Sequence, residues 1–175
     1  YENMEKAAKA LQTSVKDLQN INLGTDTDKE DTQDSIKKKL FEQIDEFAGD
    51  YNSLYKSLDQ AGGTTNTMFQ KQLKALFTTN QKNLAEIGIT MDAKGTLSVD
   101  SKTLEAADVD ILQKIFCDKD SFAARVSDKC ETIKSCANST IKVLNRMYGT
   151  QTAYNRYGTN GYYYGSSGSR YNAKS

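Results

Sequence analysis

The sequence predicts a mainly α-helical fold, an elongated antiparallel helical bundle or coiled coil that carries one small β-hairpin at about residues 88–99. Three observations favour this fold class. Apolar residues recur at steps of three and four over long stretches, as they do on one face of a helix. The 175 residues contain no proline, so no position forces a kink. Their 37% hydrophobic content is low for a compact globule but suits helices that expose much of their surface.

The first predicted helix spans residues 2–21. Its apolar stripe has coiled-coil spacing and comprises Met4, Ala8, Leu11, Val15 and Leu18. We expect Gly24 to end this helix, because glycine readily adopts the left-handed conformation found at helix ends. The segment 24–35 is acidic and has no apolar residue, so it is predicted to be a solvated loop. Asp34 or Ser35 is expected to cap the helix that follows.

The second predicted helix has the clearest apolar pattern in the chain. Its stripe steps by three or four along Ile36, Leu40, Ile44, Phe47, Tyr51, Leu54, Leu58 and Ala61. Phe41 and Tyr55 widen this stripe. Gly49 lies inside the helix, where it marks either close helix packing or a tolerated defect. The pair Gly62-Gly63 is predicted to end the helix.

A third helix is predicted over residues 67–86, capped by the Thr-Thr-Asn sequence at 64–66. With the second helix it would form an antiparallel helical hairpin. Its inward residues are Phe69, Leu73, Leu76, Phe77, Leu84 and Ile87. Asn80 lies on the same stripe, where an asparagine either fixes helix register and oligomeric state or sits at the rim in water.

The stretch EIGITMDAKGTLSVD, residues 86–100, interrupts this helical pattern. The helix stops at Gly88, and apolar residues then alternate on both sides of a turn at Asp92–Gly95. The alternating residues are Ile89, Met91, Leu97 and Val99. Because an isolated two-stranded hairpin is only marginally stable, we expect these four side chains to pack on helices.

Beyond the hairpin, the sequence predicts two short helices and a final long one. Asp100 or Ser101 is expected to cap the first, and Asp108 or Asp110 the second. The second short helix is expected to bury Val109, Leu112, Ile115 and Phe116. The final helix begins near Ser121. Its stripe comprises Phe122, Val126, Cys130, Ile133, Ala137, Ile141, Leu144 and Tyr148.

These elements would form one helical, rod-like domain over residues 1–148, followed by a Tyr/Gly/Ser-rich tail over residues 149–175. The tail holds six tyrosines, five glycines and three positive charges, with no acid. Such a composition is typical of a flexible linker. The alternative is a sticky strand, in which Tyr162, Tyr163 and Tyr164 add to a partner's sheet edge or stack on sugars. Because the chain opens on Tyr1 rather than methionine, we expect a segment upstream of it.

Composition argues against several classes of function. The 23 basic and 23 acidic side chains give a net charge of zero, which favours neither nucleic acid nor an anionic membrane as a partner. No apolar run is long enough for membrane insertion. Because the chain has no histidine and no phosphate-binding or nucleophile motif, we expect no catalytic residue, cofactor or metal site. The spacing of Cys117, Cys130 and Cys136 indicates free thiols rather than a zinc site.

Three motifs follow one another between residues 36 and 116: FAGDYNSLYKSLDQ at 47–60, LAEIGITMDAKGTLSVDSKTLEAA at 84–107 and DILQKIF at 110–116. In order and spacing this stretch resembles the flagellar filament-cap family, hook-associated protein two. The positions that match are Phe47, Tyr51, Asn52, Leu54, Leu84, Ile87, Gly88, Ile89, Gly95, Thr96, Leu97, Asp100, Leu104 and Phe116.

The resemblance implies a small β-hairpin on the side of a helical rod, where it shapes contacts with neighbouring subunits. It also implies export through the flagellar channel, assembly at the extracellular filament tip and no cofactor. The sequence departs from the family pattern in two regions. The variable outer domains are absent, and the terminal segments that form the inner coiled coil are either cut off before Tyr1 or missing. Its last helix bears cysteines, and the tyrosine-rich tail follows that helix.

We therefore expect a non-catalytic assembly or structural protein, extracellular and part of a bacterial flagellum, whose partners are copies of itself or other filament-type subunits. The interaction candidates are Ile89, Met91, Leu97, Val99, Tyr51, Asn80, Tyr162, Tyr163 and Tyr164. The alternative is a stand-alone helical adaptor or interaction module, at the cell surface or in the cytoplasm, whose tyrosine-rich tail binds a partner or a glycan.

Overall fold

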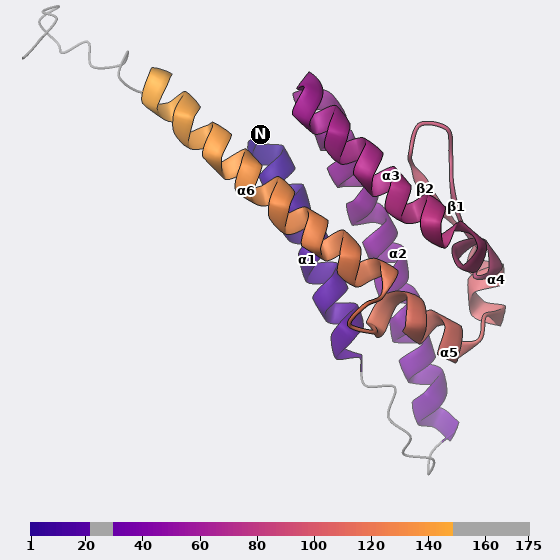
Figure 1. The fold of residues 1–175 in the computed structure, drawn as a ribbon. Helices are drawn as coiled ribbons and strands as arrows, with labels where there is room; N and C mark the ends of the chain where they lie inside the picture. The colour runs from indigo at the N-terminus through magenta and orange to yellow at the C-terminus, as the bar shows by residue number, and fades with distance from the viewer. Residues whose placement is uncertain (22–29, 149–175) are drawn as a thin grey trace, which may run out of the picture. The chain divides into compact units, whose positions relative to one another are not determined.

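A computed structural model describes residues 1–21 and 30–148, with side chains for 1–21 and 35–148. In this part of the chain it confirms a mainly α-helical fold with one two-stranded antiparallel hairpin (Figure 1). The predicted helix end at Gly24 and the tyrosine-rich tail lie outside the described residues. The elements are α1 (Glu2–Asn20), α2 (Glu30–Ala61), α3 (Gly63–Glu86), β1 (Ile89–Met91), β2 (Leu97–Val99), α4 (Ser101–Ala106), α5 (Val109–Leu112), the π-helical turn η1 (Gln113–Cys117) and α6 (Phe122–Tyr148).

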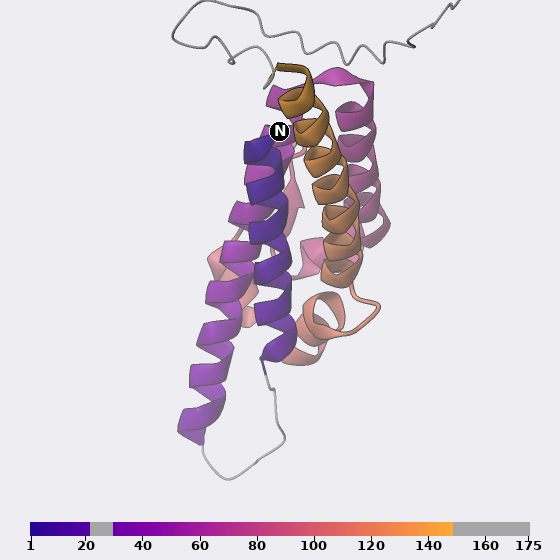
Figure 2. The same ribbon diagram turned by 90° about the vertical axis from the view of Figure 1, so that its left-hand side faces the viewer.

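The chain divides into two compact units, Tyr1–Ile141 and Lys142–Ser175, and the core described here belongs to the first. Helices α1 and α2 lie side by side and antiparallel (Figures 1 and 2). The stripe predicted for α1 is buried, and that of α2 is buried at its six central positions. The hydroxyl of Ser14, 2% exposed on α1, donates a hydrogen bond to the Asp50 carboxylate of α2. Mutual burial of the two apolar stripes stabilises these helices more than their intrinsic propensity does.

Helix α2 begins at Glu30, so the prediction that Asp34 or Ser35 caps it is wrong, because both lie inside the helix. The apolar pattern of this helix starts only at Ile36, so the helix start predicted from it is too late. Within α2, a Cβ on Gly49 would meet no atom within 4 Å, so no close packing requires a glycine there.

Helix α3 begins at Gly63, directly after α2, so the prediction that residues 64–66 cap it is wrong. Gly62 and Gly63 take φ angles of +61° and +84°, conformations that glycine adopts without strain, and this pair reverses the chain. Asn66 lies inside the first turns of α3 and is 2% exposed. Its Nδ2 atom donates to the carbonyl of Gly62 at 2.7 Å, which ties the helix start to the turn.

The short helices after the hairpin begin where their caps predict. Asp100 accepts a hydrogen bond from the Lys102 amide at 3.2 Å, and Asp108 accepts one from the Asp110 amide at 2.9 Å. Helix α5 continues into the π-helical turn η1, which the sequence did not predict. Together they bury Leu112, Ile115 and Phe116. Val109, which was predicted to be buried, is only half-buried.

The apolar stripe of α6 is buried at its first five positions, from Phe122 to Ala137. Ile141 is half-buried. Leu144 and Tyr148 are 39% and 63% exposed, so the expectation that they belong to the core is wrong. Periodicity identifies the apolar side of a helix, but it does not show how much of that side another element covers.

Candidate functional site

The hairpin is the candidate interaction site, and its apolar side faces helices. The strands pair in the register Ile89 with Val99, Thr90 with Ser98 and Met91 with Leu97. This register puts the four predicted apolar residues on one side of the hairpin. Ile89 and Leu97 are 1% and 4% exposed, and the other two are half-buried against the core. The hairpin therefore packs on the helices as predicted.

Asn52 of α2 fastens strand β2 to the helix through a pair of hydrogen bonds. Its Nδ2 atom donates to the Leu97 carbonyl at 2.9 Å, and its Oδ1 atom accepts from the Leu97 amide at 2.7 Å. The amide of Asp92 donates to the Thr96 carbonyl across the hairpin, so by alternation the amide and carbonyl of Leu97 point away from β1. The side-chain amide of Asn52 thus satisfies the outer edge of β2 in the way a third strand would.

The turn of the hairpin rests against the ring of Tyr55 on α2. Gly95 has a φ of +89°, and a Cβ there would lie 2.3 Å from the Cζ atom of Tyr55, so only glycine allows this approach. The Tyr55 ring stacks on that of Tyr51 at a centroid distance of 6.2 Å. Partial burial, together with the nearby charges of Asp59 and Asp92, raises the pKa of Tyr55.

The base of the hairpin is held against α4. Gly88 has a φ of +82°, and a Cβ there would lie 2.8 Å from the Cβ atom of Thr103. The Thr103 hydroxyl in turn donates to Asp100 Oδ2 at 2.7 Å. This hydrogen bond, with one from the Lys102 amide, lowers the pKa of Asp100. The chain therefore passes from α3 through the hairpin to α4 with no space for a larger residue at position 88.

Two of the other interaction candidates, Tyr51 and Asn80, do not face a partner: one is buried in the core and the other bonds to its own helix. Tyr51 is fully buried, and its hydroxyl has no hydrogen-bond partner among the described residues. Burial raises its pKa, and the neighbouring Tyr55 and Cys130 add to this effect. Asn80 is half-buried and donates from Nδ2 to the Leu76 carbonyl of its own helix at 2.9 Å. Tyr162, Tyr163 and Tyr164 lie outside the described residues.

This placement separates residues that hold the hairpin from those that a partner can reach. Ile89, Leu97 and Tyr51 are buried within the chain, so they support the site rather than contact a partner. The side of the hairpin that faces away from the helices carries Thr90 and Ser98, both exposed. A partner that binds the hairpin would therefore contact a small polar surface. The apolar side of the hairpin anchors that surface to the helices.

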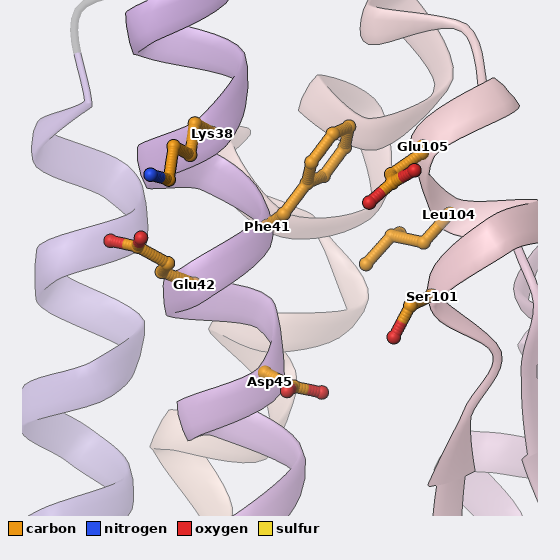
Figure 3. Close-up of a pocket in the computed structure, with 7 residues that line it drawn as sticks. All are labelled: Lys38, Phe41, Glu42, Asp45, Ser101, Leu104 and Glu105. Carbon is orange, nitrogen blue, oxygen red and sulfur yellow. The ribbon is translucent and has the colours of Figure 1, made fainter.

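A second feature is an open hollow of about 220 Å³ between α2 and α4 (Figure 3). Its lining residues are Lys38, Phe41, Glu42, Asp45, Ser101, Leu104 and Glu105. Half-buried Phe41 and Leu104, 2% exposed, make it partly apolar. Figure 3 shows Phe41 and Asp45 turned toward α4. Three carboxylates and one ammonium group give the lining a net charge of −2.

The reactive side chains of the described residues are not gathered into a site. No group of three or more histidine, cysteine, aspartate or glutamate residues is placed there to hold a metal ion. The cysteines are free thiols, and burial raises the pKa of Cys117 to about 11 and that of Cys130 to about 12. Both thiols are therefore protonated at neutral pH and weak nucleophiles. None of the helices in the described ranges is long and apolar enough to cross a membrane.

Sequence reasoning missed the roles of Asn52 and Tyr55 and did not find the hollow. Asn52 entered only as a position of the filament-cap resemblance, and Tyr55 only as a broadening of the apolar stripe. Their partners in the hairpin come about forty residues later; Asn52 and Leu97, for example, are 45 positions apart. Local periodicity contains no signal for such a pair.

Comparisons of the chain with protein-family models, curated proteins and solved structures find no match. The resemblance to the flagellar filament cap therefore stays a prediction, and the site has to be tested on its own geometry.

Asn52→Asp is expected to lower the free energy of unfolding by about 2 kcal/mol at neutral pH. The substitution removes the donor to the Leu97 carbonyl and places a carboxylate against that oxygen. A protonated carboxyl group can donate there again, so its pKa should be higher in the folded state than in the unfolded state. The variant should consequently lose least below the unfolded-state pKa and more as pH rises through the raised folded-state pKa.

Urea unfolding at several pH values measures this effect. The matched control is Asn83→Asp, the same chemical change at an exposed position of α3, which should alter stability by less than about 0.5 kcal/mol. If both variants lose the same stability at every pH, the paired hydrogen bonds of Asn52 do not hold the hairpin.

Proposed function

We propose that the chain is a non-catalytic assembly protein whose helical domain acts like the rod domain of the flagellar filament cap. Under this proposal it is exported from a bacterial cell and joins copies of itself or other filament-type subunits, without a cofactor. Assemblies of this kind repeat one contact between identical subunits, so each subunit needs a surface of fixed shape.

The fixation of the hairpin is the observation that carries this proposal. Several positions of the resemblance serve the hairpin rather than the helical stripes. Asn52 pairs with the backbone of Leu97, and Gly88 and Gly95 allow close approach where a Cβ would clash. Asp100 then caps the helix that leaves the hairpin. A helical bundle by itself requires none of these residues, whereas a hairpin held rigidly on its side requires all of them.

Rigid fixation favours docking over catalysis. A surface that is ordered before binding loses little conformational entropy when a partner arrives. The exposed side of a two-stranded hairpin is small, so a single contact through it would be weak. Repetition of weak contacts along an assembly compensates for this, since linked contacts reinforce one another.

Sedimentation velocity over a wide range of concentrations tests the proposal. We expect the weight-average sedimentation coefficient to rise with concentration, which shows reversible self-association. Electron microscopy of flagellar filaments incubated with the labelled chain should then show label at filament ends.

A chain that sediments as a strict monomer at the highest concentration would contradict the assembly proposal. The helical adaptor would then be the better account. That alternative is tested by deleting residues 149–175, which should abolish binding to a partner or glycan without loss of helical content.

A further inference from the structure

The last turns of α6 expose the largest cluster of apolar side chains in the described part of the chain. Of the six large hydrophobic residues exposed there, four lie within residues 143–148. They are Val143, Leu144, Met147 and Tyr148, which are 53%, 39%, 61% and 63% exposed. Spacings of one, three and four residues put them on one side of the helix. We call this surface the α6 end face.

The charge of the chain is divided unevenly around this face. The unit Lys142–Ser175 contains five of the 23 basic residues and none of the 23 acidic ones, so its net charge is +5. The remaining residues, Tyr1–Ile141, therefore carry −5. At about 100° per residue, Arg146 adjoins Val143 at the edge of the α6 end face, whereas Lys142 lies on the opposite side of the helix. A surface that is both apolar and basic is complementary to one that is both apolar and acidic.

The hollow between α2 and α4 has this complementary character. Its apolar part consists of Phe41 and Leu104, and its lining has a net charge of −2. In Figure 3, Asp45 and Glu105 lie on the α4 side of the helix with Phe41, whereas Lys38 and Glu42 extend from α2 in the other direction. A volume of about 220 Å³ accommodates one large apolar side chain but not a whole helix.

From these observations we infer that residues 142–148 of one copy dock into the α2–α4 hollow of a second copy. Met147 is the apolar side chain best suited to enter, because it is unbranched and flexible and fills irregular spaces. Arg146 reaches the carboxylates at the rim, where a long side chain can bend toward them. This inference rests on the proposed assembly function and adds a second contact between copies to that of the hairpin.

The two surfaces are different parts of the chain, so the contact is head-to-tail rather than self-complementary. Each copy then offers one free α6 end face and one free hollow, and addition of copies can continue into a ring or an open filament. Such a contact is small and charged, and it should weaken as salt is added.

Charge reversal of each surface, alone and in mixture, tests the contact. Full-length R146E has an acidic side chain at the edge of its α6 end face and keeps its acidic hollow. Full-length D45K/E105K has a basic hollow and keeps its basic α6 end face. Each variant alone should raise the dissociation constant for self-association, measured by sedimentation velocity, by a factor of about ten or more. An equimolar mixture of the two should recover association, because every contact between unlike copies again joins opposite charges.

Matched variants separate this contact from general effects of charge and hydrophobicity. K71E makes the same charge change at an exposed position of α3 and should associate like the unaltered chain. Met147→Asp should weaken association, whereas Met68→Asp, at a residue 49% exposed on α3, should not. Circular dichroism checks that each variant is folded.

The outcomes distinguish this inference from the assembly proposal. If the unaltered chain associates and the mixture does not recover what the two variants lose, or if neither variant loses anything, assembly stands and this contact is wrong. If the unaltered chain is a monomer, both are wrong. Recovery in the mixture, together with unchanged controls, supports the contact between copies rather than a fold-back within one chain.

Discussion

Leu97→Asp is expected to lower the free energy of unfolding by about 2 to 4 kcal/mol in urea denaturation of the full chain. Leu97 is 4% exposed and lies on the side of the hairpin that faces the helices. A carboxylate at position 97 either loses its hydration or draws the strand away from the core. The two hydrogen bonds between its backbone and Asn52 oppose any rotation that would turn the side chain outward. The loss should therefore be that of a buried, unpaired charge.

Ser98→Asp is the matched control, because Ser98 is the next residue of the same strand and points to the exposed side. Its effect should be within about 0.5 kcal/mol of zero. The contrast between neighbouring positions tests the strand register directly, since a shift of one residue would exchange the two faces. Equal losses in both variants would show that the hairpin does not present its apolar side to the helices.

Local sequence patterns were sufficient for the elements that bury one continuous face. The stripe of α1, the centre of the α2 stripe and the alternation at Ile89, Met91, Leu97 and Val99 all follow from side-chain periods of about 3.6 and 2. The caps at Asp100 and Asp108 were also predictable, because a short polar side chain before an apolar run is a local signal.

Other features depend on parts of the chain that are distant in sequence. The boundaries of α2 and α3 were misplaced because their first turns carry no apolar residue that signals a helix. The exposed Leu144 and Tyr148 continue a regular stripe, and only the fold shows where burial stops. The pairing of Asn52 with Leu97 also depends on residues that are distant in sequence. A half-buried asparagine beside a stripe is compatible with solvent exposure until its partner strand is known.

Phe47→Ala is expected to produce the largest loss, about 3 to 5 kcal/mol, because it removes a large side chain from the centre of the core. Phe47 is 1% exposed. Its ring meets Phe116 of η1 edge-on at a centroid distance of 5.5 Å and an interplanar angle of 74°. It also meets Phe122 of α6 at 6.0 Å and 72°. One side chain on α2 therefore contacts both η1 and α6.

A double-mutant cycle with Phe116→Ala makes this prediction specific. Edge-to-face pairs contribute about 0.5 to 1.5 kcal/mol beyond the area that they bury, so the double variant should lose less than the sum of the single variants. Phe47→Leu keeps most of the volume and should lose clearly less than Phe47→Ala, though it gives up the ring contact. Additive losses would show that the rings act independently. Phe47 and Phe116 are both among the positions that resemble the filament cap. Additive losses would therefore also show that no ring contact joins the motif at 47–60 to the motif at 110–116.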